Sequence, residues 1–457
     1  MKKVSARAVI ALILAAAVVL GLVWFVVQYA RHAEDWVYFS GSPHVYANGN
    51  LSTGTITDRD GTVLLQHTDS GRVYTADPTL AASVIHLLGD REGYVAAPIL
   101  SAYARQMVGY SPITGLSGQQ RGDRTMELTL SAPIQAAAYE ALAGRRGTVG
   151  VYNYKTGEIL CMVSSPAYPP DAKPEIDESD PAWEGVYVNR FTNSVYPPGS
   201  IFKLVTLAAA LETLPDAESL TFPCSGSTII GGVTVTCHEA HGTVDLKQAL
   251  ADSCNCAFGQ LAVMVGADTL QACADALGIG QGLALDGITT AAGHFDLSQA
   301  DQGALAWAGI GQYTDQVNPC QYLTVLGAIA GGGTAAQPYV VSRIKTPLGR
   351  RVYQAEPVLT QSVLSPRTAQ IIADAMAYSV ETVYGADNFG GLTVCAKTGT
   401  AELGGGAADN AMFAGFVRDD SCPVAFFIAV ENAGYGVVNC VPIASAVLAA
   451  CRTSFGS

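Results

Sequence analysis

Basic residues are scarce in this chain of 457 residues, which has 25 Lys and Arg against 39 Asp and Glu and a formal net charge of −14. A protein that binds the phosphate backbone of nucleic acid needs a basic surface, so the charge balance argues against that class. Charged residues of either sign make up only 14% of the chain, whereas hydrophobic residues make up 49%. A mostly disordered protein has the opposite composition, so we expect a folded chain with a large core.

Cysteine, glycine and proline are also too sparse for several other classes. Eleven cysteines in a chain of this length are too few for a disulfide-stabilised scaffold. The 48 Gly and 21 Pro do not reach the content of a low-complexity chain. No repeated unit occurs, and the length corresponds to about three average domains.

One long uncharged run lies near the N-terminus, from Ala8 to Ala30. As a helix it would be about 35 Å long, enough to cross the ~30 Å hydrocarbon core of a membrane. Three basic residues precede the run and only Arg31 follows it closely. The positive-inside rule therefore predicts a cytoplasmic tail (residues 1–7), a single-pass membrane anchor (8–30) and an extracytoplasmic remainder. A cleaved signal peptide is the alternative, but its apolar region is only about 7–15 residues long and ends in small residues.

The part after the anchor divides at a loop rich in turn-forming residues, Ser111 to Asp123. Before this loop, ITDRDGTVLLQ predicts a β-hairpin around its Asp-Gly pair, and a mixed helical stretch follows from Pro78 to Met107. We therefore expect a small N-terminal pedestal domain over residues 31–120 and a main domain over residues 121–457.

The main domain has strand-like runs at both ends of a helical middle. After a helix over Pro133–Ala143, strands are expected in TVGVYNY and EILCMVSS, joined by a Lys-Thr-Gly turn at 155–157. The helix-rich part runs from Ser200 to about Ala330. Late strands in TVCAKTGTAE, MFAGFV and CPVAFFIAVE precede a closing helix over Pro442–Cys451. This order predicts an α+β fold with a sheet packed on helices.

Ser200-Ile-Phe-Lys203 follows Pro-Pro-Gly and opens the apolar run LVTLAAALE. Pro and Gly end the preceding structure and Ser favours a helix start, so the Ser and Lys should share one helix face, about one turn apart. A serine hydroxyl becomes a nucleophile when a neighbour removes its proton, and a shielded lysine with a lowered pKa can be that base. A second copy, Ser342 to Lys345, lies in a strand-like run where the two side chains would face opposite sides, so we interpret it as structural.

Two further motifs carry polar side chains into apolar surroundings. The only S-x-N of the chain, at 253–255, falls inside or at a break in a helical stretch. Its polar groups should face each other or a cleft, because burying them without partners is costly; an ordinary helix cap is the alternative. A Lys-Thr-Gly tripeptide at 397–399 lies in a strand-like run, where the glycine would admit a ligand close to the backbone and the lysine would supply positive charge.

These motifs, in this order, are the signature of penicillin-interacting serine acyl enzymes, and the chain resembles a class B penicillin-binding protein. NRFTNSVYPPGSIFK, HGTVDLKQALADSCNCAF and CAKTGTAE resemble motif segments of that family, and ITDRDGTVLL and YNYKTGEILCMVSSPAYPP resemble two more. The resemblance covers most of residues 55–450. It implies a penicillin-binding, serine β-lactamase-like transpeptidase domain of α+β class, with an antiparallel sheet packed on helices, after the pedestal domain and one transmembrane helix.

The resemblance also implies a peptidoglycan D,D-transpeptidase that cross-links stem peptides ending in D-Ala-D-Ala. Ser200 would attack the D-Ala-D-Ala amide, with Lys203 as the general base. Ser253 and Lys397 would help return a proton to the leaving amine, and Asn255 would hold the substrate backbone. The remaining expected substrate-binding residues are Thr398, Gly399 and Thr400. The backbone N–H groups of the nucleophile and of the second threonine would form the oxyanion hole.

The implied partners are the stem peptides, the membrane and β-lactams, which would acylate the same serine. A membrane glycosyltransferase of the wall-synthesis machinery is a candidate partner, no nucleic acid is expected, and no metal or organic cofactor is needed. The segment before the main domain is too short for the glycosyltransferase domain of the bifunctional class.

Three alternatives remain. A D,D-carboxypeptidase or β-lactamase would use the same residues with water in place of the acceptor amine, but the long chain and pedestal segment favour transpeptidation. A β-lactam-sensing receptor would need a signalling element inside the cell, and the expected tail of residues 1–7 leaves no room for one. A catalytically idle scaffold is disfavoured by the complete motif set.

The cysteines permit a disulfide, because disulfides persist outside the cytoplasm. Cys224 and Cys237 flank the stretch SGSTIIGGVTVT, which could fold back as a hairpin, so they are the expected intrachain pair. The odd number of cysteines leaves at least one unpaired within the chain. His238, Glu239 and His241 add zinc-capable side chains nearby, but the spacing matches neither C-x₂-C pairs nor H-E-x-x-H. We therefore expect a disulfide or free thiols rather than a metal.

Overall fold

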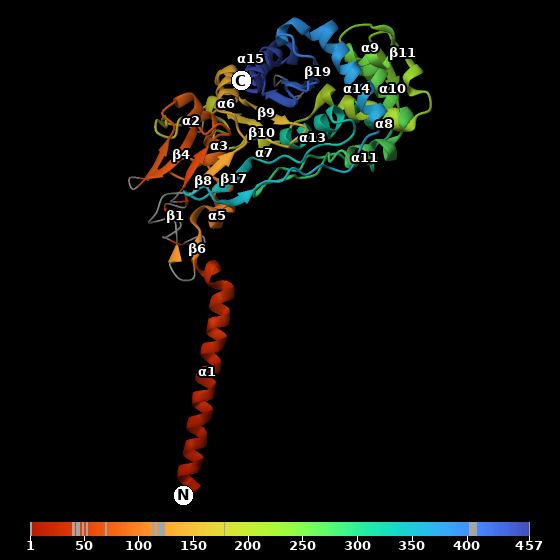
Figure 1. Cartoon of the computed structure of the whole chain (residues 1–457). Helices are drawn as coiled ribbons and strands as arrows, with labels where there is room; N and C mark the ends of the chain where they lie inside the picture. The colour runs from red at the N-terminus through yellow and green to blue at the C-terminus, as the bar shows by residue number, and fades with distance from the viewer. Residues whose placement is uncertain are drawn as a thin grey trace.

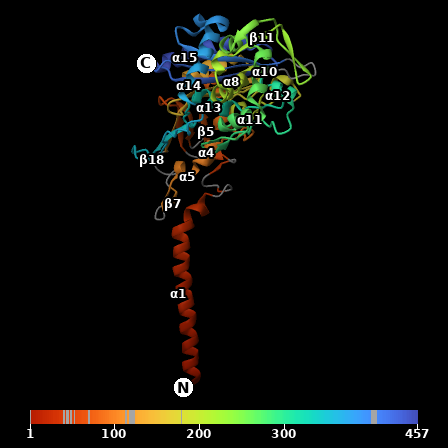
Figure 2. The same cartoon turned by 90° about the vertical axis from the view of Figure 1, so that its right-hand side faces the viewer.

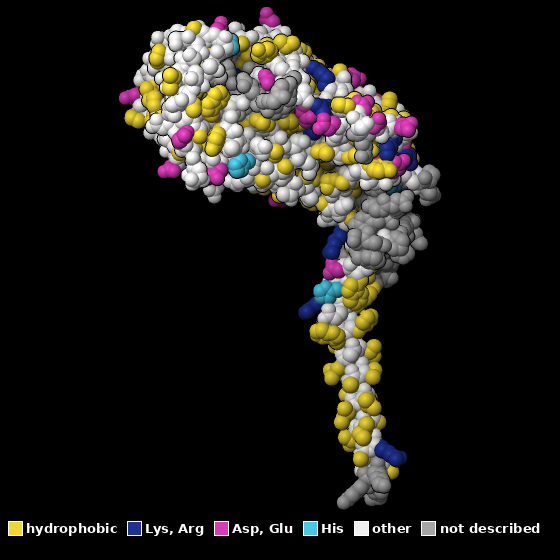
Figure 3. Space-filling view, turned by 180° about the vertical axis from the view of Figure 1, so that it is seen from behind, with side chains coloured by type: hydrophobic (Ala, Val, Ile, Leu, Met, Phe, Trp, Pro, Cys, Tyr) yellow, Lys and Arg dark blue, Asp and Glu magenta, His cyan; other side chains and the backbone are white. Residues whose placement is uncertain are grey.

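The computed structural model describes residues 2–38, 42, 46–47, 50–51, 54–68, 71–111, 115–116, 124–177, 179–401 and 409–456. A long helix, α1 (Lys2–Val37), projects away from the other elements in both views (Figures 1 and 2). It contains an apolar span, Val4–Ala33, whose most apolar 18-residue window has a mean hydropathy of 3.0 and is 0% buried. Figure 3 shows hydrophobic side chains along its length. The predicted apolar helix is confirmed, and it is long enough to cross a membrane.

The N-terminal strands belong to a six-stranded sheet with the order β18-β17-β8-β3-β4-β5. Its strands are β3 (Thr55–Thr57), β4 (Val63–Thr68), β5 (Gly71–Tyr74), β8 (Thr125–Leu128), β17 (Val341–Lys345) and β18 (Arg351–Gln354). β3 and β4 form the predicted hairpin, whose turn is closed by Asp58: its carboxylate accepts the N–H groups of Asp60 and Thr62 at 2.9 and 2.8 Å. The predicted mixed helical stretch consists of α2 (Pro78–Ser83), α3 (Ile85–Leu88), α4 (Pro98–Ala102) and α5 (Ala104–Val108).

This sheet contains strands from both sides of the boundary predicted at residues 111–123. β3 is a parallel neighbour of β8, and β17, from far later in the chain, pairs with β8 on its other side. Residues 112–114 and 117–123 of the boundary loop lie outside the described residues. The division into a pedestal domain (31–120) and a main domain (121–457) stays a prediction.

A five-stranded antiparallel sheet with the order β10-β9-β21-β20-β19 forms the centre of the fold. Its strands are β9 (Gly147–Asn153), β10 (Ile159–Ser165), β19 (Val394–Ala401), β20 (Asn410–Val417) and β21 (Val424–Val430). They lie in the runs predicted as strands, and every residue of β9, β10, β20 and β21 is buried. A sheet covered on both faces needs such continuous apolar runs.

Helices cover both faces of this sheet, which confirms the predicted α+β class. α6 (Ala132–Leu142) and α15 (Gly436–Gly456) pack on one face, and α13 (Pro319–Ala330) packs on the other (Figure 1). The closing helix is longer than the expected Pro442–Cys451, since a proline is typical of a helix start but does not exclude residues before it. Pro442 lies inside α15, and the residues before it extend the buried contact with the sheet.

The helical middle of the chain is interrupted by small antiparallel strand pairs. Its helices are α8 (Lys203–Thr213), α9 (Leu246–Ala251), α10 (Asn255–Val265), α11 (Ala267–Ala276), α12 (Gln302–Ala308) and α13, and α14 (Pro366–Ser379) follows later in the chain. β12 (Ser227–Ile230) and β13 (Val233–Thr236) form the hairpin predicted between two cysteines, and β11 (Thr221–Cys224) pairs with β14 (Gly242–Asp245). Other short strands and helices are β1 (Tyr46–Ala47), β2 (Asn50–Leu51), β6 (Tyr110–Ser111), β7 (Gly115–Leu116), β15 (Ala284–Leu285), β16 (Ile288–Thr289) and α7 (Arg190–Asn193).

Candidate active site

The predicted nucleophile lies in a 3₁₀ turn, η2 (Gly199–Phe202), that leads directly into α8. The α-helix therefore begins at Lys203 rather than at Ser200. The chain enters the turn through Gly199, whose φ of 52° lies in the left-handed region that favours glycine. A Cβ on Gly199 would come within 2.5 Å of the Thr400 carbonyl oxygen. The tight turn still keeps the pair together, because Lys203 Nζ lies 3.1 Å from Ser200 Oγ.

Lys203 is fully buried, and oxygen atoms surround its amine. Its Nζ lies 2.6 Å from the Ser253 carbonyl oxygen, 2.7 Å from Asn255 Oδ1 and 3.1 Å from Ser253 Oγ. Burial, and secondarily the charge of Lys397, holds the pKa of Lys203 well below its ordinary value. A neutral amine can donate two N–H groups to the carbonyl oxygens and keep its lone pair for a hydroxyl proton. The geometry therefore suits Lys203 as the acceptor of the Ser200 proton.

Ser253 lies at the break between α9 and α10, not inside a helix. Its φ of 53° is uncommon for a residue other than glycine. This backbone conformation places Ser253 Oγ between two lysines, 3.1 Å from Lys203 Nζ and 3.0 Å from Lys397 Nζ. Because a hydroxyl can accept one hydrogen bond and donate another, Ser253 can pass a proton between the two amines.

The helix-cap role in this turn belongs to the middle residue of the S-x-N motif. Cys254 is the N-cap of α10, and its Sγ accepts the N–H of Ala257 at 3.4 Å. Asn255 contacts the lysine through Oδ1 and donates from Nδ2 to the Thr236 carbonyl oxygen at 2.8 Å. The amide is thus held between β13 and Lys203, so its orientation is fixed from both ends.

Lys397 is the second fully buried lysine, and it enters the same network from β19. Its Nζ donates to the Thr398 carbonyl oxygen at 3.0 Å and lies 3.4 Å from Tyr384 Oη. Burial lowers the pKa of Lys397 to about 7. A lysine whose pKa lies this far below its ordinary value can both give and receive a proton near neutral pH.

The predicted substrate-binding residues follow Lys397 along β19, the edge strand of the central sheet. Thr398 and Thr400 are partly exposed, whereas Gly399 is buried against the nucleophile segment. A Cβ on Gly399 would come within 2.9 Å of the Pro198 carbonyl oxygen. The glycine is therefore needed for the packing of β19 on η2. An edge strand can pair with an extended peptide through its backbone groups.

One residue of the network was not predicted from the sequence. Tyr384 ends a π-helical turn, η4 (Val380–Tyr384), and its Oη lies 3.1 Å from Thr398 Oγ1 and accepts the Thr398 N–H at 3.2 Å. Burial raises the pKa of Tyr384, so its hydroxyl stays protonated. No sequence pattern marked this tyrosine, although π-helical turns are frequent at functional sites.

The two duplicate motifs lie in the positions predicted for structural copies. Ser342 and Lys345 lie on β17, and the lysine pairs with Glu127 at 3.2 Å. The Lys-Thr-Gly copy at 155–157 forms the turn between β9 and β10. Neither copy contacts the network around Ser253 in the described part of the chain.

The structure brings the predicted cysteine pair together without linking it. Cys224 and Cys237 are free thiols whose sulfurs lie 3.6 Å apart, well beyond a disulfide bond length of about 2.05 Å. His241 Nδ1 lies 3.3 Å from Cys224 Sγ. His238 and Glu239 are exposed on the surface. Of the zinc-capable residues considered from the sequence, Cys224, Cys237 and His241 thus converge at a partly buried point, whereas His238 and Glu239 lie close to His241 on the exposed side.

Comparison with known proteins places this geometry in context. The penicillin-binding protein transpeptidase domain matches residues 147–449. The peptidoglycan D,D-transpeptidase PbpA of Mycolicibacterium smegmatis is 30% identical over 366 residues, covering 73% of this chain and 74% of the relative. Penicillin-binding protein A of Mycobacterium tuberculosis, solved as a ceftriaxone acyl-enzyme, superposes with a TM-score of 0.75 at 26% identity, over 87% of this chain and 98% of that one. The D,D-transpeptidase domain of a peptidoglycan glycosyltransferase from Eggerthella lenta gives a TM-score of 0.72 at 29% identity, over 88% and 99% of the two chains.

Proposed function

This chain belongs to the penicillin-binding protein transpeptidase family, and we propose that it is a peptidoglycan D,D-transpeptidase that works through an acyl-enzyme on Ser200. The observation that carries the proposal is the buried network in which Lys203 Nζ contacts Ser200 Oγ and Ser253 Oγ bridges the two lysines. Two lysine amines with lowered pKa values, one of them in contact with the hydroxyl of the partly exposed Ser200, can move protons to and from that hydroxyl.

In the acylation step, neutral Lys203 takes the proton of Ser200 while Oγ attacks the carbonyl carbon of the penultimate D-Ala. The backbone N–H groups of Ser200 and Thr400 stabilise the oxyanion, an effect of about 2.7–4 kcal/mol per donor in a comparable site. Collapse of the tetrahedral intermediate breaks the amide bond. Ser253 relays a proton from the lysines to the departing D-Ala nitrogen.

In the second step, an amine from another stem peptide attacks the acyl-enzyme, and the same groups transfer protons in the opposite direction. The acceptor nitrogen gives its proton toward Lys203, and Ser200 Oγ recovers a proton as it leaves. Asn255 and the edge of β19, including Thr398, Gly399 and Thr400, hold the donor peptide in an extended form. A β-lactam that acylates Ser200 keeps its leaving nitrogen attached, so the acyl-enzyme persists.

The N-terminal helix anchors the protein in a membrane. We further propose that residues 1–7 are cytoplasmic and that the catalytic part is outside, since basic residues are concentrated before the helix. Stem peptides are then accessible to the site. A membrane glycosyltransferase is the proposed partner, because cross-linking acts on glycan strands that a polymerase supplies.

Intact mass of the full chain in detergent, after incubation with penicillin, tests the nucleophile. We expect one stable adduct of one drug mass, absent in Ser200→Ala and retained in Ser342→Ala, the matched serine of the duplicate motif. Rapid destruction of the drug without an adduct would instead identify a β-lactam hydrolase. Intact drug and no adduct on folded protein would leave only the scaffold alternative.

A second assay separates transpeptidation from simple hydrolysis. The full chain is incubated with a synthetic stem peptide ending in D-Ala-D-Ala and an excess of an acceptor amine. Mass analysis should show the acceptor joined to the donor in place of the terminal D-Ala. Release of D-Ala with only water added to the acyl group would make the protein a D,D-carboxypeptidase.

A further inference from the structure

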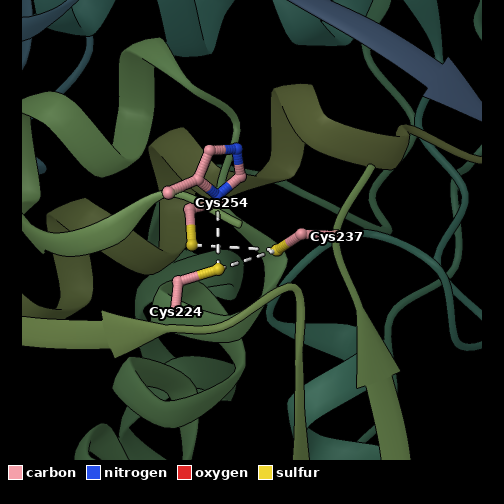
Figure 4. Close-up of side chains that lie close together, drawn as sticks. Cys224, Cys237 and Cys254 are labelled. Atoms are coloured by element: carbon pink, nitrogen blue, oxygen red, sulfur yellow. Dashed lines mark hydrogen bonds between the residues drawn. The ribbon is translucent and has the colours of Figure 1, made fainter. Parts of the chain in front are cut away.

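A second cluster of reactive side chains lies directly behind the Ser253–Asn255 turn. The sulfurs of Cys224, Cys237 and Cys254 and Nδ1 of His241 all lie within 4.8 Å of one another. Figure 4 shows the three cysteine sulfurs directed toward a common centre. None of these four side chains has a part in the proposed reaction.

The four ligands come from separate segments that the fold brings to one point. Cys224 ends β11 and pairs with Gly242 of β14, so His241, the residue before Gly242, lies beside it. Cys237 directly follows the β12–β13 hairpin, and Cys254 is the N-cap of α10. Successive members of the cluster are separated by 12, 3 and 12 residues, a spacing that matches none of the short zinc motifs, which is why the sequence argued against a metal.

All six separations between the four ligand atoms are within 4.8 Å, and three of them are close to those of a tetrahedral site. The sulfur–sulfur separations are 3.6 Å for Cys224 and Cys237 and 3.8 Å for Cys237 and Cys254, and Cys224 Sγ lies 3.3 Å from His241 Nδ1. With Zn–S bonds of about 2.3 Å and a Zn–N bond of about 2.0–2.1 Å, tetrahedral geometry requires about 3.8 Å between sulfurs and about 3.5 Å between sulfur and nitrogen. We propose that Cys224, Cys237, His241 and Cys254 form a structural zinc site.

The chemistry of the surroundings supports thiolate ligands. The backbone N–H of Cys256 donates to Cys237 Sγ and that of Ala257 donates to Cys254 Sγ, both at 3.4 Å. These N–H groups belong to the first turn of α10, whose positive dipole end favours negative charge on the sulfurs. Hydrogen bonds of this kind orient and tune metal ligands. Three sulfurs and one imidazole suit Zn²⁺, whereas Mg²⁺ and Ca²⁺ require oxygen ligands.

A fourth cysteine nearby serves as an internal comparison. Cys256 Sγ lies 3.5 Å from Cys237 Sγ, but its thiol is directed to the Val235 carbonyl oxygen at 3.7 Å. It is not among the four atoms that are mutually close. Cys256 therefore lies beside the site without completing it.

The site would hold the catalytic turn in place. Cys254 lies between Ser253 and Asn255, and Thr236, whose carbonyl oxygen accepts from Asn255, directly precedes Cys237. One ion would thus tie the ends of β11, β13 and β14 to the turn that carries two residues of the network. Ser253 keeps its left-handed backbone conformation more readily when both sides of the turn are fixed.

Metal content of the full chain tests the site, without relying on activity. The protein is purified in detergent with reductant and without chelator, incubated with Zn²⁺, desalted and measured by elemental mass spectrometry. We expect about one zinc per chain, a loss of most of it in Cys224→Ser and Cys254→Ser, and retention in the matched control Cys256→Ser. No zinc in the wild type, or zinc lost from Cys256→Ser but kept by Cys254→Ser, would overturn the assignment.

Two measurements on the wild-type chain cover the case in which a variant does not fold. Co²⁺ in place of Zn²⁺ should give thiolate charge-transfer bands and the strong visible bands of a tetrahedral site. Chelation should lower the melting temperature, with recovery on adding Zn²⁺ but not Mg²⁺. A Cys224–Cys237 disulfide detected by peptide mass in protein purified without reductant, together with no zinc after reduction, would replace the metal site with a redox pair.

Discussion

The chain contains the S-x-x-K pattern twice, and the two copies lie in opposite surroundings. Ser200 and Lys203 occupy a 3₁₀ turn and the start of a helix, where the lysine is fully buried and contacts the serine hydroxyl. Ser342 and Lys345 lie on a strand, where the lysine side chain is 33% exposed and pairs with Glu127. The same residue types thus give a proton acceptor in one place and an ordinary ion-paired lysine in the other.

The Lys-Thr-Gly pattern shows the same contrast. Lys155 lies in a turn, 48% exposed, with Asp420 at 2.5 Å, whereas Lys397 is buried in β19 beside Ser253 Oγ. Lys397 is removed from water and has no carboxylate partner among the residues that the structure describes, which favours its neutral form. Lys155 instead forms an exposed ion pair. What separates the copies is therefore burial and the identity of the neighbours, both of which come from the tertiary fold.

The largest expected difference between the copies is in acylation. Lys203→Met keeps the volume of the side chain but removes the base, so the rate of penicillin acylation should fall by about 10²–10⁴-fold. Lys345→Met, the matched change in the duplicate motif, should leave the rate within about twofold of wild type, because surface substitutions change energies by only about 0.5 kcal/mol. Stopped-time intact mass gives both rates. An unchanged rate in Lys203→Met would assign the base to another group.

A smaller difference is expected in the pH dependence of stability. Burial lowers the pKa of Lys397 to about 7 from an ordinary 10.5, so between these values the unfolded chain holds a proton that the folded chain has released. The unfolding free energy should rise with pH across this window, by up to about 1.4 kcal/mol per pH unit from this group. Urea unfolding of the full chain in detergent, from pH 7 to 10, should show a flatter slope for Lys397→Met. Lys155→Met should keep the wild-type slope; a flatter slope there would mean that the buried lysine is not the cause.

The sequence predicted those parts of the fold that depend on local pattern. Continuous apolar runs identified the buried strands of the central sheet, and the Asp-Gly pair identified the β3–β4 hairpin. The motif residues of the network were also identified, because residues 200 and 203 share one turn and residues 397–400 share one strand. Helix ends were less accurate, as α15 shows, since a proline can lie inside a helix whose buried contacts continue on both sides.

What the sequence did not predict depends on contacts between distant segments. The pairing of β8 with β17 joins strands more than two hundred residues apart, and loop-closure over such a distance has no local signature. The cluster of Cys224, Cys237, His241 and Cys254 spans a much shorter stretch, and its first three members were grouped from the sequence; only Cys254, which reaches them from the turn before α10, was not. Tyr384 was missed because its hydroxyl reaches Thr398 from a separate turn, through packing alone.

Tyr384 also gives the smallest expected effect and the sharpest test of how far the network extends. Tyr384→Phe keeps the ring but removes the hydroxyl that accepts the Thr398 N–H and lies beside Lys397. A hydrogen bond of this kind contributes about 0.5–1.5 kcal/mol, so acylation should slow by about 2- to 10-fold if the tyrosine positions β19 for reaction. Tyr378→Phe, which removes a hydroxyl bonded to Gln248 at 2.7 Å, is the matched control and should leave the rate unchanged. Acylation rates and melting temperatures of both variants show whether Tyr384 takes part in the reaction. Equal destabilisation with equal rates would make Tyr384 a packing residue. A slower rate in Tyr384→Phe alone would extend the site beyond the three motifs.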